Sequence, residues 1–423
     1  MNKHDTLSLW DYTALEKPPE SPRALDTSID VAIVGGGFTG LSTALHLAQK
    51  GVDCCVLEAH QIGYGGSGRN AGLVNAGLWL PPQDAQSRLG SQYGPHFIEV
   101  FGQAPDYVFS LIEQHQIQCE AQRNGTIHAA HSKIGLQDLA RRAEEWHRLG
   151  APVELLDDKQ TAQKIGSHRF FGGLLDRRAG TINPMGYVRG LARAADSAGA
   201  KIHTGVKVLK LERNDKTWNL ATSRGRFSAK SIVLATNAYT DTLWPGLQRS
   251  FTKIHYFQVA TEPLGERATN ILPDVKGLWD TGRVMFSLRK DSSGRLIIGS
   301  MGKIIGGENG VSKYWADKTL RRLFPELGSV QWEKAWHGQI AMTQDHLPHI
   351  HRLASGLYTP IGYNGRGITT GTIFGKAMAE LLTGMPENQL LLPLSEVKQD
   401  RSGFLKSLLY ETTFKVYRLY KSL

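Results

Sequence analysis

Three glycines and one carboxylate near the N-terminus have the types and the spacing of a dinucleotide-binding site. Gly35, Gly37 and Gly40 stand in the pattern G-x-G-x-x-G, and Glu58 ends the next apolar run. Gly35 permits a tight turn, Gly37 lets backbone N–H groups approach a pyrophosphate, and Gly40 lets a helix pack closely on a strand. A carboxylate at the place of Glu58 accepts hydrogen bonds from the hydroxyls of an adenosine ribose. The four residues therefore predict a site for FAD or NAD.

The sequence around this motif predicts the elements that would position it. Residues 30–35 form a short apolar run, which indicates a buried strand. Residues 41–50 carry apolar side chains at helical spacing, and a second apolar strand follows over 52–57. Such a strand–turn–helix–strand unit presents the free N–H groups and the dipole of a helix N-terminus to a pyrophosphate. The structural alternative is a glycine-rich turn that binds nothing.

Two further glycine-rich stretches favour FAD over NAD. One covers residues 61–77, directly after the predicted unit, and the other covers 362–372 near the opposite end of the chain. A flavin enzyme retains its cofactor and surrounds it with distant segments, whereas NAD is held only briefly. An NAD(P)-dependent dehydrogenase is the alternative.

The remaining pattern alternates between predicted helices and strands. Residues 83–150 are mostly helical in pattern, and another helix is expected over 368–382. The strands at 284–288 and 295–300 flank a turn at 290–294 and predict a hairpin. The other predicted strands are 206–211, 218–222, 231–237, 255–261 and 356–361.

Composition narrows the function classes. The net charge of +10 would suit nucleic acid, an anionic membrane or acidic substrates, but the basic residues are scattered and favour a solvated surface. A basic RNA-binding protein or a non-catalytic flavoprotein remains a second alternative, although no nucleic-acid motif is present and no metal site is expected. Three cysteines and an N-terminus without an apolar signal core indicate a cytoplasmic protein.

Together these stretches resemble the D-amino-acid oxidase and glycine/sarcosine oxidase superfamily of flavoproteins, with the nearest likeness to the bacterial branch that contains γ-glutamylputrescine oxidoreductase. The likeness is carried in family order by residues 31–40 with Glu58, 66–72, 233–238, 294–299, 336–338 with Thr343, Asp345 and Pro348, and 362–367.

The resemblance implies an α/β (α+β overall) fold, in which a Rossmann-like FAD-binding domain is interleaved with an antiparallel-sheet substrate domain. It implies residues 28–82, 150–245 and 332–390 for the FAD-binding domain and 83–149 and 246–331 for the substrate domain, with 391–423 as a basic amphipathic tail.

The resemblance also implies roles for individual residues. Residues 67–70 would follow the pyrophosphate and the flavin edge, the backbone near Val208 would touch the adenine, and residues 365–368 would approach the pyrimidine end of the flavin. For Arg366, a surface arginine in a turn is the alternative. The full set expected at FAD is Gly35, Gly37, Phe38, Thr39, Gly40, Glu58, Ser67, Gly68, Arg69, Asn70, Ala71, Val208, Thr236, Asn237, Gly365, Arg366, Gly367 and Ile368.

The implied reaction is oxidation of the C–N bond of a small amine or amino acid, with hydride transfer to the flavin and hydrolysis of the imine product. A substrate carboxylate would need an arginine, and Arg289 is the candidate, with a solvent-facing arginine as the alternative. Tyr256 and His255 begin a strand that could line the pocket, or they could be core residues.

Two departures from the family bear on the cofactor. No cysteine follows Cys119, so the resemblance implies non-covalent FAD. The strand 295–298 has no lysine at the place where some relatives promote the reaction with oxygen, so the acceptor is oxygen or another compound.

The tail permits two interpretations: a helix on a membrane surface, or a helix packed on the protein with its basic face in water, which we favour.

Overall fold

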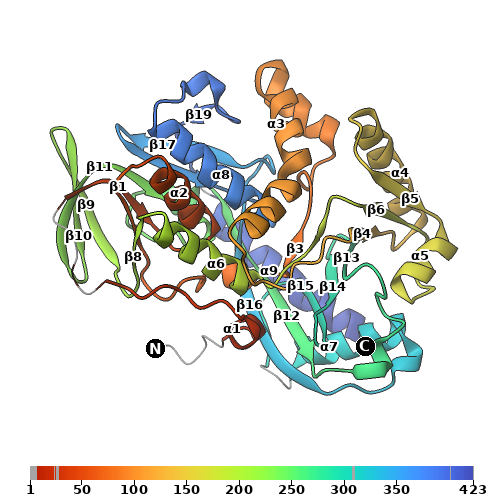
Figure 1. Ribbon diagram of the computed structural model, residues 1–423. Helices are drawn as coiled ribbons and strands as arrows, with labels where there is room; N and C mark the ends of the chain where they lie inside the picture. The colour runs from red at the N-terminus through yellow and green to blue at the C-terminus, as the bar shows by residue number, and fades with distance from the viewer. Residues whose placement is uncertain (1–6, 23, 25–27, 307–309, 401, 423) are drawn as a thin grey trace.

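Two large sheets dominate the computed structural model, which describes the chain apart from residues 1–6, 23, 25–27, 307–309, 401 and 423 (Figure 1). Residues 307–309 of the predicted range 246–331, and residues 401 and 423 of the predicted tail, lie outside the described residues. Both sheets are covered by helices. The helices are α1 (Leu9–Thr13), α2 (Phe38–Gln49), α3 (Pro82–Gln114), α4 (Lys133–Arg148), α5 (Asp158–Ile165), α6 (Pro184–Ser197), α7 (Val311–Leu323), α8 (Gly367–Leu382) and α9 (Gly403–Ser422).

The first sheet has a parallel centre in the order β18-β11-β1-β2-β8. Its apolar strands are buried on both faces, as parallel sheets require, and α2 packs on β1 and β2 between α6 and α8. Its strands are β1 (Ser28–Val34), β2 (Cys54–Leu57), β8 (Lys201–His203), β9 (Val208–Asn214), β10 (Thr217–Thr222), β11 (Gly225–Leu234), β17 (His349–Ala354), β18 (Leu357–Ile361) and β19 (Leu394–Ser395).

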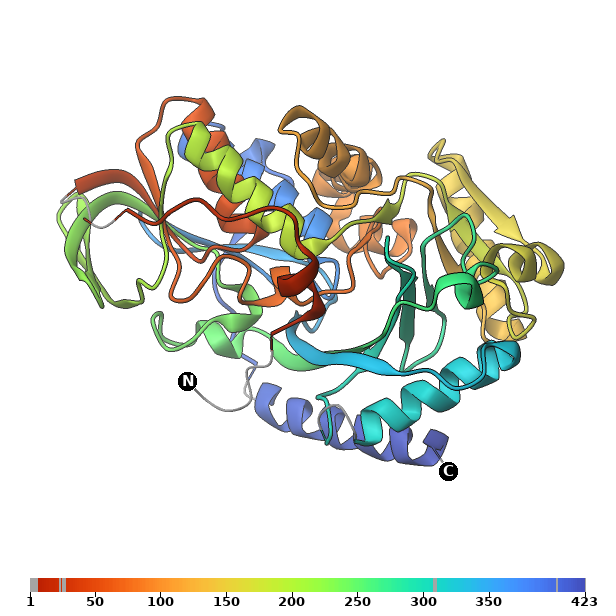
Figure 2. The same ribbon diagram turned by 60° about the horizontal axis from the view of Figure 1, so that its bottom comes forward.

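The second sheet is antiparallel except where β13 pairs with β4, and its order is β16-β12-β15-β14-β13-β4-β6-β5. α7 and α9 lie side by side against it (Figure 2). Its strands are β4 (Thr126–Ala129), β5 (Val153–Leu156), β6 (Gly173–Asp176), β12 (Thr252–Thr261), β13 (Gly277–Asp280), β14 (Phe286–Lys290), β15 (Leu296–Met301) and β16 (Trp332–Met342). A separate pair joins β3 (Leu73–Val74) to β7 (Gly180–Thr181).

The predicted fold class is confirmed: a Rossmann-type parallel sheet and an antiparallel sheet are built from interleaved segments. The hairpin of β14 and β15 is present, with Leu288 opposite Ile298. Some strands differ from the implied segments, because β5 and β6, within 150–245, and β16, within 332–390, pair in the second sheet. The long strand β16 pairs with β12 of the second sheet, although its residues belong to a segment that the prediction gave to the FAD-binding domain. A division of the sequence into separate segments does not describe such a strand.

The N-terminal segment is a second difference from the prediction, which began the fold at residue 28. α1 buries Leu9 and Trp10 completely. The ring of Trp10 lies edge-on to that of Trp336, with centroids 5.8 Å apart. The indole Nε1 of Trp10 donates to the carbonyl of Asn70 at 2.9 Å. A segment that reads as polar in the sequence therefore closes one side of the glycine-rich loop.

α2 packs closely against α8, and small residues make the approach possible. A Cβ at Gly375 would lie 2.4 Å from the Cβ of Ser42, and a Cβ at Gly371 would lie 3.1 Å from Oγ1 of Thr39. The hydroxyl of Ser42 donates to the carbonyl of Thr372 at 2.7 Å. Because these contacts proceed in the same direction along both helices, α2 and α8 run parallel and begin at the same end.

This packing predicts the effect of filling the gap. In a Gly375→Val variant the new side chain has to displace Ser42, so we expect a loss of at least about 2 kcal/mol in the free energy of unfolding. Urea unfolding followed by circular dichroism measures the change. Lys376→Val is the matched control, because it brings the same side chain to a half-exposed neighbouring position. Valine also has a higher helix propensity than glycine and a lower one than lysine, so a loss as large in the control as in Gly375→Val would contradict the contact with Ser42 as the cause.

Candidate functional site

A cavity of about 760 Å³ is lined by residues of both sheets. Its size lies in the range of small-molecule and cofactor sites. Val34, Leu57 and Ala235, at or just beyond the carboxyl ends of β1, β2 and β11, line one side. The other side is formed by strands of the second sheet, among them β12, β14 and β16. Ligands of open parallel sheets bind at this carboxyl edge.

Two helix N-termini meet at this cavity. α2 has Gly37 as its N-cap and α8 has Arg366, and neither N-cap side chain bonds back to its own helix. The first N–H group of α2, that of Phe38, donates to Oγ of Ser67 at 3.0 Å. A Cβ at Gly37 would lie 2.8 Å from Oγ of Ser67, so only glycine fits there without a shift. The other N–H groups of the two first turns and two aligned helix dipoles make this wall of the cavity a binding surface for negative charge. The pyrophosphate and the carbonyl-bearing edge of a flavin both have this character, so the residues present fit FAD.

Glu58 organises the turn that precedes α2. Its carboxylate accepts the backbone N–H of Gly36 at 2.7 Å and that of His60 at 2.9 Å. Burial raises the pKa of Glu58, while the two N–H donors act in the opposite direction. A carboxylate offers more acceptor positions than these two donors use. Glu58 therefore both holds the turn and lines the cavity, where ribose hydroxyls can donate to it.

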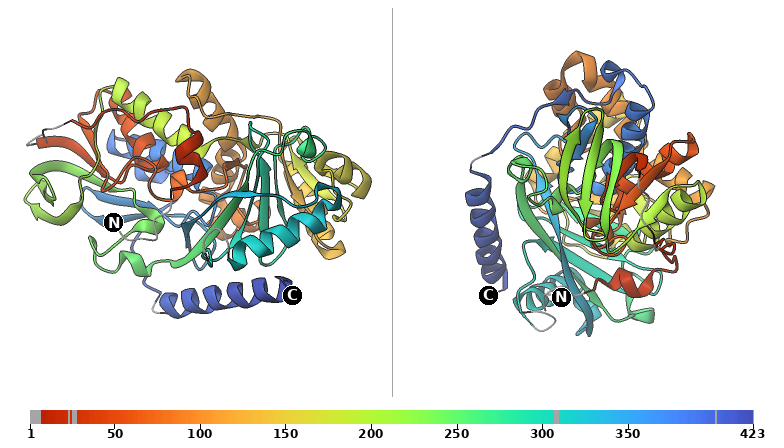
Figure 3. Two further views of the ribbon diagram at one scale, coloured as in Figure 1. Left: turned by 90° about the horizontal axis from the view of Figure 1, so that it is seen from below. Right: turned by 90° about the vertical axis from the view of Figure 1, so that its left-hand side faces the viewer.

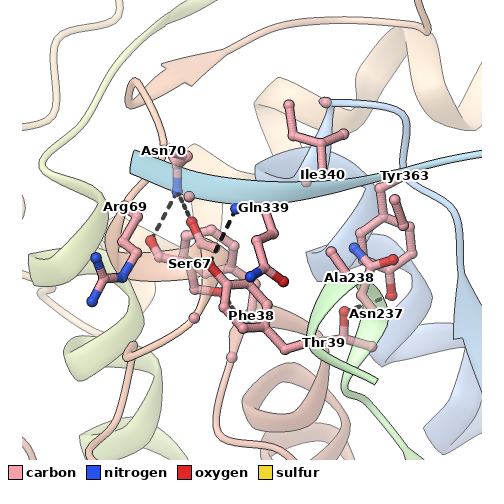
Figure 4. A pocket seen from close by; sticks show the side chains of 18 of the residues that line it. Phe38, Thr39, Ser67, Arg69, Asn70, Asn237, Ala238, Gln339, Ile340 and Tyr363 are labelled. Atoms are coloured by element: carbon pink, nitrogen blue, oxygen red, sulfur yellow. Dashed lines mark hydrogen bonds between the residues drawn. The ribbon is translucent and has the colours of Figure 1, made fainter. Parts of the chain in front are cut away.

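Hydrogen bonds hold the second glycine-rich stretch around Arg69 and Asn70, and Figure 4 shows those made by Asn70. Nδ2 of Asn70 donates to the carbonyls of Ser67 at 2.8 Å and Gly66 at 3.1 Å. Gln258 Nε2 and Trp336 Nε1 donate to the carbonyl of Arg69 at 2.7 and 3.0 Å. The short helical turn Gly66–Gly68 is thus held between the two sheets.

Most of the predicted site residues gather at the cavity. Gly40 and Gly68 do not line it, because they serve the backbone: a Cβ at Gly40 would lie 1.9 Å from the carbonyl oxygen of Gly35, and one at Gly68 would lie 2.3 Å from that of Gly63. Those that line it are Gly35, Gly37, Phe38, Thr39, Glu58, Ser67, Arg69, Asn70, Ala71, Val208, Thr236, Asn237, Tyr256, Gly365, Arg366, Gly367 and Ile368.

The structure corrects the prediction for His255 and Arg289, because neither side chain lines the cavity. Neighbouring residues of a strand point to opposite faces, so Tyr256 faces the cavity while His255 turns to α9 and pairs with Glu411 at 2.8 Å. Arg289 is 2% exposed, and its guanidinium donates to the carbonyls of Ala71 and Ile182 beneath the glycine-rich loop. A substrate carboxylate in the cavity must find another cation.

Arg366 is a buried cation at the cavity without a protein acceptor. It is 8% exposed, and its guanidinium lies 4.8 Å from the ring centroid of Trp279 and 5.2 Å from that of Trp79. Within the described chain no residue accepts a hydrogen bond from this side chain, and its Nε is buried. Burial, and next the nearby charge of Arg142, lowers the pKa of Arg366 to about 9, so the group stays charged at neutral pH.

Tyr256 contributes its ring rather than an acid or a base. Its hydroxyl lies 2.7 Å from Oγ of Ser287 and 3.0 Å from the carbonyl of Gly299. Burial raises the pKa of Tyr256 above its ordinary value, so the phenol stays neutral. The ring is available for packing and for contact with a cationic ligand.

Several lining residues escaped the sequence analysis. Gln339 and Ile340 come from β16 and line the cavity (Figure 4). Tyr363 lies inside the glycine-rich motif at residues 362–367, and its hydroxyl is 2.7 Å from Oγ1 of Thr39. Trp79 and Trp279 follow no motif, and only the fold brings them together.

Asp280 controls the loop that supplies Gly282, Arg283 and Met285 to the cavity. It ends β13, and its Oδ1 accepts the backbone N–H of Phe286 at 2.9 Å. The side chain is buried, and this burial raises the pKa of Asp280 to about 6.

Comparison with known proteins agrees with this geometry. A family model described as FAD dependent oxidoreductase (DAO) matches residues 30–381. The γ-glutamylputrescine oxidoreductase of Escherichia coli (strain K12) is 31% identical over 397 residues, which are 92% of this chain and 91% of that protein. A probable oxidoreductase OrdL of Rhizobium meliloti (strain 1021) is 30% identical over 379 residues, which are 89% of this chain and 88% of that protein. The crystal structure of glycine oxidase from Geobacillus kaustophilus superposes with a TM-score of 0.69 at 22% identity, covering 85% of this chain and 95% of that one, and shows the same fold.

The buried carboxyl of Asp280 predicts a pH-dependent stability. Its pKa is raised in the folded protein, so its contribution to stability is complete below the ordinary value of 3.8 and is lost as the pH rises through about 6. Asp280→Asn should remove this loss. Between pH 4 and pH 7 the variant should therefore gain on the order of 2 kcal/mol relative to the parent protein. Urea titrations at several pH values test this, and parallel curves for both proteins would contradict it.

Proposed function

The chain belongs to the DAO family of FAD dependent oxidoreductases, and on that basis we propose that it oxidises the C–N bond of a small amine or amino acid. The observation that carries the proposal is the cavity at which the N-termini of α2 and α8 meet. The family model is one of FAD dependent oxidoreductases, so the alternative of an NAD(P)-dependent dehydrogenase is not favoured.

We assign the α2 side of the cavity to the dinucleotide. The backbone of Gly37 and Phe38 would bind the pyrophosphate, Glu58 would accept from the ribose, and the backbone of Val208 would contact the adenine. On the other side, the N–H groups of Gly367 and Ile368 would face the carbonyl-bearing edge of the flavin. FAD supplies the hydride acceptor of the reaction, and the oxidised amine leaves as an imine that water hydrolyses.

The cysteines support non-covalent FAD and a reducing compartment. Cys54, Cys55 and Cys119 are buried, and none lines the cavity. Among the described residues they form no disulfide, which supports a cytoplasmic location. Within the part of the chain that the structure describes, no helix is both long and apolar enough to cross a membrane.

We assign Arg366 to a carboxylate of the substrate. A buried guanidinium without an acceptor has lost its water, and a carboxylate restores two hydrogen bonds in a bidentate geometry. The indole rings of Trp79 and Trp279 beside the guanidinium restrict its position. Arg283 also lines the cavity but is exposed, so water already satisfies it. The proposed substrate is therefore an amine that carries a carboxylate, and its electrons pass on to oxygen or another acceptor.

A spectral titration tests the reaction. The purified protein should show the absorbance of oxidised flavin, and under anaerobic conditions one class of amine or amino acid should bleach it. Acid precipitation should release the flavin into the supernatant if it is held non-covalently. A colourless protein that takes up no added FAD would refute the proposal, and admission of air after bleaching shows whether oxygen is the acceptor.

The role of Arg366 predicts a selective defect. Arg366→Leu should raise KM for a carboxylate-bearing amine about 10- to 100-fold, because a charge-assisted pair is lost, and should change kcat less. The descarboxy analogue should be oxidised equally by both proteins. Arg283→Leu is the matched control and should have the smaller effect, at equal flavin content. If the Arg366 variant loses both substrates equally, the arginine does not bind the carboxylate.

A further inference from the structure

The helix α9 docks on the second sheet through a largely polar face. The hydroxyl of Ser407 donates to the carbonyl of Lys253 at 2.6 Å. The carboxylate of Glu411 accepts the backbone N–H of His255 at 3.1 Å and that of Lys303 at 3.2 Å. Phe414 is buried beside them. The helix is therefore held in place chiefly by hydrogen bonds along one side.

The opposite face of α9 is apolar and exposed. Leu405, Leu408, Leu409 and Val416 are 66%, 58%, 65% and 60% exposed, and their spacing places them in one stripe. A surface helix normally turns its apolar stripe to the core of its own protein. In α9 the orientation is reversed, so the stripe lacks the partner that its composition calls for. Figure 3 shows α9 along the outside of the molecule, with its long axis parallel to the surface.

The surroundings of the stripe are basic. By helical spacing, Lys406 and Lys415 stand at its two edges. α7 and the described side chains of α9 together contain six lysine or arginine residues and two carboxylates. Both carboxylates are already engaged, Asp317 with Arg321 at 2.8 Å and Glu411 with His255. Lys406 is itself paired with Asp400, which precedes α9, at 2.7 Å. An apolar stripe between basic edges is the pattern of a helix that lies in a membrane interface.

We propose that α9 binds the surface of an anionic lipid bilayer. The four apolar side chains enter the boundary between headgroups and acyl chains, and the lysines contact the lipid phosphates. A second copy of the chain fits this face less well, because two identical basic surfaces would be brought together against their mutual repulsion. The proposal does not depend on the identity of the substrate, since it concerns a face built by α7 and α9.

Cosedimentation of the full-length, FAD-loaded protein with vesicles tests the proposal. We expect binding to vesicles that contain phosphatidylglycerol, much weaker binding to phosphatidylcholine alone, and release by salt. The double variant Leu408→Glu/Leu409→Glu should lower the binding constant at least about tenfold, with unchanged flavin content and amine oxidation. Ile134→Glu is the matched control, because Ile134 is 72% exposed and belongs to another helix, α4, and it should bind as the parent protein does.

Three results would overturn the proposal. The first is equal binding of the parent protein to anionic and neutral vesicles. The second is an equal loss in the Ile134 variant. The third is a dimer in solution that the double variant converts to a monomer while vesicles bind neither form, since this would assign the face to a second copy of the chain.

Discussion

The arrangement of the site depends on how closely two helices can approach. α2 follows the first glycine motif and α8 follows the last, and between them lies most of the chain. They meet because Gly371 and Gly375 present no side chain to Thr39 and Ser42. Larger residues would separate the helices, and their N-termini would no longer share one wall of the cavity. The absence of side chains at two glycines thus affects the electrostatics of the site, because it lets two helix N-termini point toward one ligand.

The glycine-rich loop over 66–72 depends on the second sheet for its shape. Gln258 of β12 and Trp336 of β16 donate to the carbonyl of Arg69, and Arg289 of β14 donates to that of Ala71. Trp10 donates to the carbonyl of Asn70 from the N-terminal helix. Buried carbonyls need such donors. The two sheets are therefore joined at the loop that faces the cofactor cavity, and a rigid wall there is what an oriented hydride transfer requires.

The sequence predicted the parts of the site whose chemistry is local. Gly35, Gly37 and Glu58 were expected at the site from their spacing alone and line the cavity, and the parallel strands around them follow from short apolar runs. It did not predict Trp79, Trp279 or Gln339, which reach the cavity only because distant strands pair. For His255 the prediction was wrong because the sequence predicted the strand but not which of its alternating residues face the cavity. Adjacent residues of a strand point to opposite faces, so His255 faces α9 instead. Tyr256, on the other face of the same strand, lines the cavity.

Arg289 and Arg366 show why burial alone does not identify a binding residue. Both side chains are almost completely buried, and burial lowers the pKa of each, to about 10 for Arg289 and about 9 for Arg366. Arg289 directs its donors at two carbonyls, and it stacks 4.8 Å from the ring centroid of Trp10. Arg366 has aromatic neighbours too but no acceptor in the described chain. Removing a cation from water is costly unless something replaces the lost hydrogen bonds. For Arg289 the carbonyls of Ala71 and Ile182 replace part of the lost hydrogen bonds, although its Nε, like that of Arg366, has no partner among the described residues. For Arg366 the hydrogen-bond acceptors have to come from a ligand that enters the cavity. The two arginines therefore differ in the acceptors that the protein offers them, and this difference identifies the one that can bind a substrate.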